Sequence, residues 1–241
     1  MHSHTELTLE VLRQPDDETC GPTCLHAVYA YYGDLLDLEQ VIREVRPLAT
    51  GGTLAAYLGL NALERGYVAT LYTYNLGVVD PTWFREEPLR LAERLHEQAK
   101  VKTNPSLLTA TDAYLDFLGG GGRVRFEELR PELIRGHLLE GRPIMAGLSS
   151  TYLYDCARET MRGKVSEYDS IEGVAVGHFV VIHGYDASTD SVLVADPLHD
   201  NPRFRMSNYR VGIMRLLGAI MLGVLTYDAN LLVIEPPEAS V

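Results

Sequence analysis

The sequence lacks the basic residues that mark nucleic-acid-binding and membrane-surface proteins. It has 21 lysine and arginine residues against 33 aspartate and glutamate residues, and its formal net charge at pH 7 is −12. No lysine or arginine cluster offers an electrostatic footprint for a phosphate backbone, and the negative charge disfavours an anionic membrane surface. We therefore expect no nucleic-acid partner and no membrane partner.

The sequence also lacks a hydrophobic run long enough to span a bilayer. The longest apolar tract, residues 211–226, is interrupted by Arg215, Gly218 and Gly223, and it falls short of the roughly 20 residues that a membrane helix needs. We interpret this tract as a buried helix and its exit. Residues 1–14 contain no basic segment followed by an apolar one, which is the pattern of a secretory signal, so we expect a cytoplasmic protein.

Cysteine is scarce, since the chain has only Cys20, Cys24 and Cys156. An odd number of cysteines in a reducing compartment argues against structural disulfides. The stretch "CGPTC" supplies fewer ligands than a metal site needs, so we expect neither a metal nor another cofactor.

The order of patterns along the chain predicts helices first and strands later. No repeat, low-complexity tract or Pro/Ser-rich linker is present, so we expect a single domain over residues 1–241. Pro22 in a first turn and Gly33 at the far end bracket a helix over residues 23–32, with Cys20 just before it. Further elements are expected as a helix over 36–45, a helix within 50–67 capped by Thr53 and closed by Gly66, a strand over 68–74, a helix within 126–141 and a strand over 142–150.

Residues 75–122 are mostly helical and polar in pattern and end in four glycines. The motifs described below need none of this region, so we interpret it as a mainly helical insertion in the domain. Its leucines recur at helical spacing in "PLRLAERL", which creates an apolar face that must pack against another surface. Two placements stay open: a lid that restricts the cleft to short peptides or chain ends, and a dimer contact away from it.

The segment with the strongest strand pattern is "GHFVVIHGYDASTDSVLVADP", residues 177–197. Two runs of β-branched and aromatic residues flank the turn "DASTD", which predicts an antiparallel hairpin. His178 opens the first strand and Asp196 closes the second, so an imidazole and a carboxylate are expected to meet at one rim of the sheet. His183 faces the opposite side of its strand, and residues 158–177, rich in charge and glycine, are expected to form a loop.

Cys20 stands in the position expected of a reactive cysteine, because the unpaired N–H groups and the positive end of a helix favour a thiolate there. A thiolate that attacks an amide carbonyl needs an imidazole to protonate the leaving nitrogen, a group that orients the imidazole, and donors for the oxyanion. His178, Asp196 and Gln14 have the side chains for these tasks. The backbone N–H of Cys20 would be the second oxyanion donor.

The remaining cysteines and two further histidines have simpler interpretations. Cys24 lies one turn inside the helix, where packing is the expected role, and Cys156 is expected to be a packed or surface thiol. His26 on the helix and His183 on the strand are expected to be structural.

Taken in order, "QPDDETCGPTCLHAVYAYYG", "GHFVVIHGYD" and "VLVADP" resemble the papain-fold cysteine peptidases that process the double-glycine leader peptides of bacteriocins, and their stand-alone relatives. The resemblance implies that Cys20 is the nucleophile, His178 the general acid and base, Asp196 the orienting residue and Gln14 part of the oxyanion hole. The stretches "YNLGVVDPTWF", "PIMAGLSSTYLY" and "GVLTYDANLLVI" are similar to those of a stand-alone bacterial branch associated with ATP-grasp peptide ligases. This similarity implies a ligated peptide or a side-chain amide as the substrate.

These interpretations converge on an α+β, papain-like fold, in which a helical half and an antiparallel sheet hold the active site between them. The expected function is cleavage of a peptide or amide bond by a cysteine through an acyl-enzyme thioester. The same four residues would serve an acyl or peptidyl transferase, because the outcome depends on whether water or an amine reaches the thioester. A peptide-binding module without catalysis is the third alternative, and the oligomeric state is left open.

Overall fold

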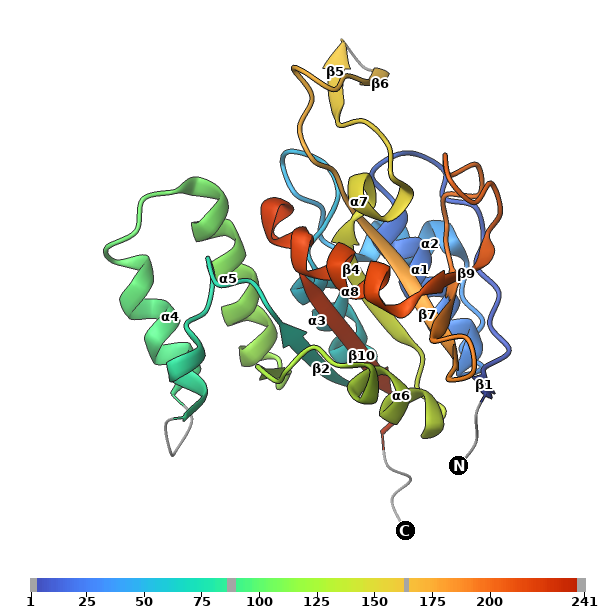
Figure 1. Cartoon of the computed structure of the whole chain (residues 1–241). Helices are drawn as coiled ribbons and strands as arrows, with labels where there is room; N and C mark the ends of the chain where they lie inside the picture. The colour runs from blue at the N-terminus through green and yellow to red at the C-terminus, as the bar shows by residue number, and fades with distance from the viewer. Residues whose placement is uncertain (1–3, 86–89, 163–164, 238–241) are drawn as a thin grey trace.

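The computed structural model describes residues 4–85, 90–162 and 165–237, and its centre is one large twisted sheet (Figure 1). The strands follow the order β3-β2-β10-β4-β7-β8-β9, and β1 pairs with β7. All neighbours are antiparallel except β2 and β3, which are parallel. The strands are β1 (His4–Glu6), β2 (Val68–Thr73), β3 (Arg123–Arg125), β4 (Ile144–Ser149), β7 (Gly177–Asp186), β8 (Ser191–Ala195), β9 (Asn208–Gly212) and β10 (Asn230–Glu235).

Helices cover both faces of this sheet, so the protein has two hydrophobic cores. On β7, Phe179 and Val181 join the core that contains helix α1, whereas Val180 and Ile182 join the core on the other face. This division follows from the alternation of side chains along a strand. The first face carries α1 (Cys20–Tyr31), α2 (Leu38–Glu44) and α3 (Ala55–Glu64); the second carries α6 (Pro131–Leu139), α7 (Ser150–Tyr154), α8 (Ile213–Leu222) and the short 3-10 helix η2 (Gly223–Thr226).

The expected helix near Cys20 is present, but it begins earlier than the sequence pattern predicts. Helix α1 starts at Cys20 itself, so this residue belongs to the first turn and does not precede it. The reason is that a proline at position 22 fits the third residue of a helix as well as the first, since N–H groups of the first turn have no intrahelical partner. Gly33, with φ of +87°, follows the end of the helix as predicted.

The predicted start of α3 is wrong. Thr53 does not cap the helix, which begins at Ala55; instead, the Thr53 hydroxyl donates to the Arg46 carbonyl at 2.8 Å. That bond joins the two ends of the loop between α2 and α3. The predicted end is right, because Gly66 follows the helix with φ of +86°.

Part of the 75–122 region is helical as expected, with η1 (Pro81–Arg85), α4 (Leu91–Ala99) and α5 (Pro105–Gly119). Helix α4 packs on α5, and α5 packs on α3. Figure 1 shows the pair at the side of the molecule where β2 and β3 form the edge of the sheet. Residues 86–89 lie outside the described part of the chain.

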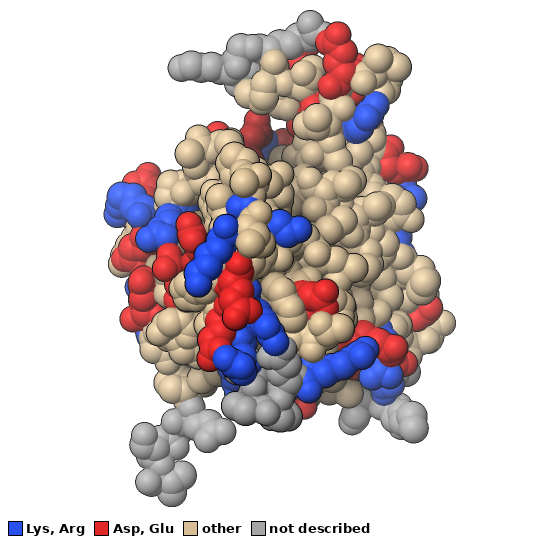
Figure 2. Space-filling model, turned by 90° about the vertical axis from the view of Figure 1, so that its left-hand side faces the viewer, with Lys and Arg blue, Asp and Glu red and all other residues tan. Residues whose placement is uncertain are grey.

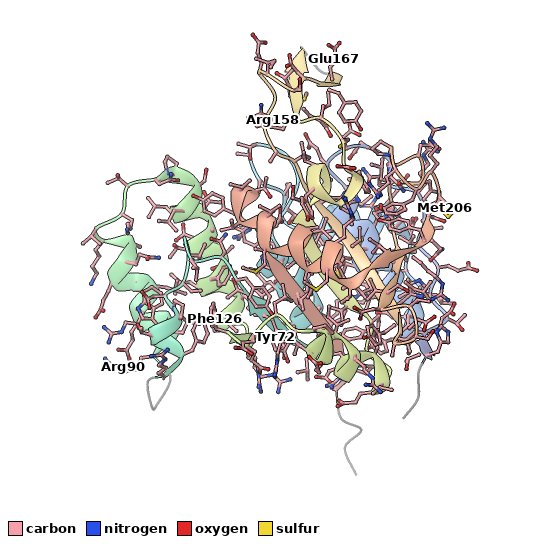
Figure 3. All side chains as sticks on the ribbon, in the orientation of Figure 1. Tyr72, Arg90, Phe126, Arg158, Glu167 and Met206 are labelled. Atoms are coloured by element: carbon pink, nitrogen blue, oxygen red, sulfur yellow. The ribbon has the colours of Figure 1, made fainter. Side chains whose placement is uncertain are left out.

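The expected loop over residues 158–177 is wrong, because strands β5 (Glu159–Arg162) and β6 (Val165–Tyr168) pair as an antiparallel hairpin. Its residues are mostly polar, with neither a strict alternation of polar and apolar residues nor a continuous apolar run, so the sequence carries no strand pattern here. The hairpin projects above the body of the molecule (Figures 1 and 2). In Figure 3, Glu167 lies near its tip and Arg158 at its base.

The apolar tract at 211–226 forms the end of β9, helix α8 and η2, so the expected helix and exit are present. The helix is only half buried, because Met214, Met221 and Leu222 are exposed. Across the described ranges, no helix combines the length and apolarity needed to cross a membrane.

Candidate active site

Cys20 lies on the wall of a cavity of about 760 Å³, between the start of α1 and the start of β7. The glycine that follows it allows this placement. A Cβ atom at Gly21 would lie 2.8 Å from Thr53 Cγ2 and 3.3 Å from the Phe179 ring, so a larger residue would push the helix away from both α3 and β7. The absence of a side chain at Gly21 therefore lets the first turn of α1 approach both α3 and β7 closely.

His178 and Asp196 meet at the rim of the sheet, as the hairpin pattern predicts. The imidazole Nε2 lies 2.9 Å from Asp196 Oδ1. His178 is the second residue of β7, and Asp196 directly follows β8, which is paired with β7 in antiparallel register. Both side chains are buried.

The Cys20 side chain also lies close enough to the His178 imidazole to affect its pKa, and both residues line the same cavity. Because Nε2 faces Asp196, Nδ1 is the ring nitrogen left for the sulfur. Burial would lower the pKa of His178, but the Asp196 carboxylate and the Cys20 group oppose this and raise the pKa to about 10. With a pKa of about 10 the imidazole holds a positive charge at neutral pH, next to the Cys20 side chain.

Asp196 is fully buried and accepts hydrogen bonds at both carboxylate oxygens. Oδ1 accepts from His178 and from the backbone N–H of Leu198, while Oδ2 accepts from the hydroxyls of Tyr154 at 2.8 Å and Tyr209 at 2.7 Å. Burial and the adjacent carboxylate raise the pKa of each tyrosine, so both remain donors. These bonds fix the carboxylate and, through it, the plane of the imidazole.

Sequence reasoning missed both tyrosines. Tyr154 comes from α7 and Tyr209 from β9, and neither lies in a recognisable motif. Their approach to Asp196 depends on the tertiary fold, so no local pattern signals it.

Gln14 is buried near this site, but its side chain makes a local bond. Its Nε2 donates to the Asp16 carbonyl at 2.8 Å, and its Oε1 has no hydrogen-bond partner in the described structure. An amide nitrogen has two N–H groups, so one donor remains after the bond to Asp16. Gln14 is not among the described residues that line the cavity.

The cysteines and histidines that were expected to be structural each have a hydrogen-bond partner other than Cys20. Cys24 is fully buried, its thiol donates to the Phe179 carbonyl at 3.3 Å, and burial raises its pKa. Cys156 is partly exposed, and burial raises its pKa as well. His26 Nε2 lies 3.0 Å from the Leu36 carbonyl, and His183 Nδ1 lies 3.0 Å from the Leu7 carbonyl.

The cavity is bounded by the β5–β6 hairpin and by a buried carboxyl group, Asp228, and neither was expected from the sequence. Thr160, Met161 and Ser166 of the hairpin line it, whereas no residue of the 75–122 region does so within the described chain. The lid placement for that region therefore does not agree with the structure. No group of three or more potential metal ligands occurs within residues 4–85, 90–162 and 165–237.

Residues 96–211 match the Peptidase_C39 like family. The matched region includes His178 and Asp196 and begins after Cys20. No curated protein matches the chain. The match indicates a cysteine peptidase, and the layered helices and sheet have the α+β, papain-like arrangement expected of one.

Three solved structures are similar to this chain at low sequence identity. The peptidase domain of Streptococcus ComA, a bifunctional ABC transporter, is 13% identical, with 94% of this chain and 98% of that chain covered and a TM-score of 0.44. A double-glycine-motif protease from an AMS/PCAT transporter, in complex with the leader peptide, is 14% identical, with 96% and 94% covered and a TM-score of 0.46. Xylellain, a cysteine protease from Xylella fastidiosa, is 15% identical, with 97% and 86% covered and a TM-score of 0.43.

Proposed function

We propose that the protein cleaves a peptide or amide bond through a thioester acyl-enzyme formed on Cys20. The observation that supports this most directly is that Cys20 and His178 line the same cavity, while the His178 imidazole Nε2 lies 2.9 Å from the buried carboxylate of Asp196. Cys20 and His178 line a cavity large enough for several residues of a peptide, whereas Asp196 is fully buried and is not among the described lining residues.

In the first step, the Cys20 thiolate attacks the carbonyl carbon of the scissile bond. The C–N bond then breaks, and the His178 imidazolium gives its proton to the leaving nitrogen. In the second step, water attacks the thioester, His178 accepts a proton from this water, and the carboxylic acid leaves as the thiolate forms again. Asp196 holds the imidazole in one orientation through both steps.

The oxyanion of each tetrahedral intermediate needs donors close to Cys20. In this proposal they are the Cys20 backbone N–H, which has no intrahelical acceptor in the first turn of α1, and the second N–H of the Gln14 amide. An N–H at the start of a helix also carries the positive end of the helix dipole, which favours the negative oxygen.

We further propose that the reaction takes place in the cytoplasm on a ligated peptide or a side-chain amide, as an ATP-grasp ligase would produce. Support for this comes from the stretches around residues 74–84, 143–154 and 223–234, whose pattern resembles the ligase-associated branch.

The test is chemical labelling combined with peptide cleavage. Iodoacetamide at neutral pH is expected to modify Cys20 first, because Cys24 is buried and the pKa values of both other thiols are raised. Cys20→Ala should abolish cleavage of a quenched peptide library, while Cys156→Ala should retain it. Faster labelling of Cys156, or cleavage that survives in Cys20→Ala, would overturn the proposal.

A further inference from the structure

The wall of the cavity around Cys20 is acidic. Among the described residues that line it there is no lysine or arginine, and six have carboxyl side chains: Asp16, Asp17, Glu18, Glu159, Glu172 and Asp228. Arg158, at the base of the hairpin, donates to the carbonyls of Ser170 and Ile171 and is not one of the lining residues. Five of the six carboxyl groups lie at the more open rim, whereas Asp228 is the buried one.

Asp228 is held in the wall by a constrained backbone. It lies between η2 and β10, and its backbone N–H donates to the Gly223 carbonyl at 3.0 Å. The residues on each side of it, Tyr227 and Ala229, have φ of +63° and +55°. Residues other than glycine rarely adopt this left-handed conformation, and it costs on the order of 1 kcal/mol each. Two such residues around one carboxyl group indicate that its position is maintained at the expense of stability.

The strand that carries His178 also makes room for this carboxyl group. A Cβ atom at Gly177 would lie 2.0 Å from Asp228 Oδ2, and one at Gly147 would lie 3.3 Å from Oδ1. Both positions are occupied by glycine, which lets the carboxyl group approach the backbone next to His178. Asp228 is therefore adjacent to the end of the cavity at which the scissile bond is placed under the proposed function.

Within the described chain, Asp228 has fewer hydrogen-bond donors than Asp196, and none of them carries a positive charge. The Thr226 hydroxyl donates to Oδ2 at 2.6 Å, and within the described chain Oδ1 has no hydrogen-bond partner. The side chain is only 5% exposed. Burial raises its pKa to about 7, although the Thr226 bond and the charge of His178 act in the opposite direction. A buried carboxylate without a cation is unfavourable, and a cation from a ligand would relieve that cost.

We propose that Asp228 binds a primary ammonium group of the substrate next to the scissile bond, and that the acidic rim attracts cationic peptides into the cleft. This inference rests on the proposed function. The ammonium group can come from a lysine-type side chain or from the α-amine of a peptide N-terminus. Both supply the same three donors to Oδ1 and to nearby acceptors.

The test compares matched peptides with purified full-length enzyme. The first arm uses quenched peptides with blocked termini that carry lysine, N-ε-acetyl-lysine or norleucine at each position around the cleavage site. The second arm uses peptides with neutral side chains and either a free or an acetylated N-terminus. The wild-type enzyme is expected to prefer the ammonium form in at least one arm by about tenfold or more in kcat/KM. The arm that shows the preference identifies the source of the ammonium group.

Asp228→Asn should reduce this ratio to about one, whereas Asp112→Asn should leave it unchanged. Asp112 is an exposed aspartate on α5, outside the cavity, so it controls for the loss of one negative charge. Equal cleavage of the ammonium and acetylated forms by the wild-type enzyme would overturn the inference even if Asp228→Asn failed to fold. Retention of the preference by a folded Asp228→Asn would overturn it too.

The proposed function fails in a different way. If no peptide in either arm is cleaved and Cys20 is not the labelled thiol, then peptide cleavage at Cys20 is refuted, and this inference with it. Cleavage that depends on Cys20 but ignores the charge of the peptide refutes the role of Asp228 alone.

Discussion

The buried carboxyl group of Asp228 makes a prediction about stability that is independent of any substrate. Burial raises its pKa from 3.8 to about 7 in the folded protein. Between these two pH values the unfolded chain has released the proton while the folded protein still holds it. Raising the pH through this range therefore destabilises the wild-type protein, because the folded state binds more protons.

Asp228→Asn removes this cost, since asparagine does not ionise. A pKa difference of this size corresponds to about 4 kcal/mol in the free energy of unfolding, which is an upper bound if water enters the site. The variant should be more stable than the wild type at pH 8.5, and the difference should decrease towards zero as the pH falls to about 4. The Thr226 hydroxyl can still donate to the asparagine side-chain oxygen, so little else changes.

The measurement is urea-induced unfolding followed by circular dichroism at several pH values, with Asp112→Asn as the control. The control changes the same charge on the exposed surface of α5 and should shift the free energy of unfolding by less than about 0.5 kcal/mol at every pH. An Asp228→Asn variant that is no more stable than the wild type at pH 8.5 would refute the reasoning. An advantage that does not grow with pH would do so as well, because only an ionising carboxyl group gives that dependence.

Two further predictions concern the parts of the site that the sequence did not reveal. Tyr209→Phe removes one hydrogen-bond donor from Asp196 but no residue of the cavity wall. We therefore expect kcat to fall by about tenfold while KM stays close to the wild-type value. A change confined to KM would contradict a positioning role for Tyr209. Replacing residues 160–167 by two glycines removes three lining side chains but no group bonded to Cys20 or His178, so KM for short peptides should rise with little change in kcat. If kcat is lost instead, the hairpin acts on the chemistry and not on substrate binding.

The local parts of the site could be predicted from the sequence, because local geometry determines them. His178 opens one strand and Asp196 follows its neighbour, and the two strands are joined by the four residues 187–190, so the hairpin pattern alone brings them together. Cys20 could be placed at a helix start from Pro22 and Gly33, although the first turn begins earlier than expected.

The rest depends on contacts between distant segments, which periodicity does not encode. Tyr154, Tyr209 and Asp228 enter the site from α7, β9 and the turn before β10, and each approach requires the completed sheet. The β5–β6 hairpin has mixed polar and apolar residues and little packing against the body, so a hydrophobic pattern has no signal for it.

Strand β10 links parts of the sheet that lie far apart in the sequence. It lies between β2 and β4, and the carboxyl group of Asp228 immediately precedes it. Loss of residues 230–235 would leave β2 and β4 each without one neighbour and would release the segment that places Asp228 in the wall of the cavity. A local unfolding of β10 is therefore expected to disturb the cavity beside Cys20 as well as the sheet.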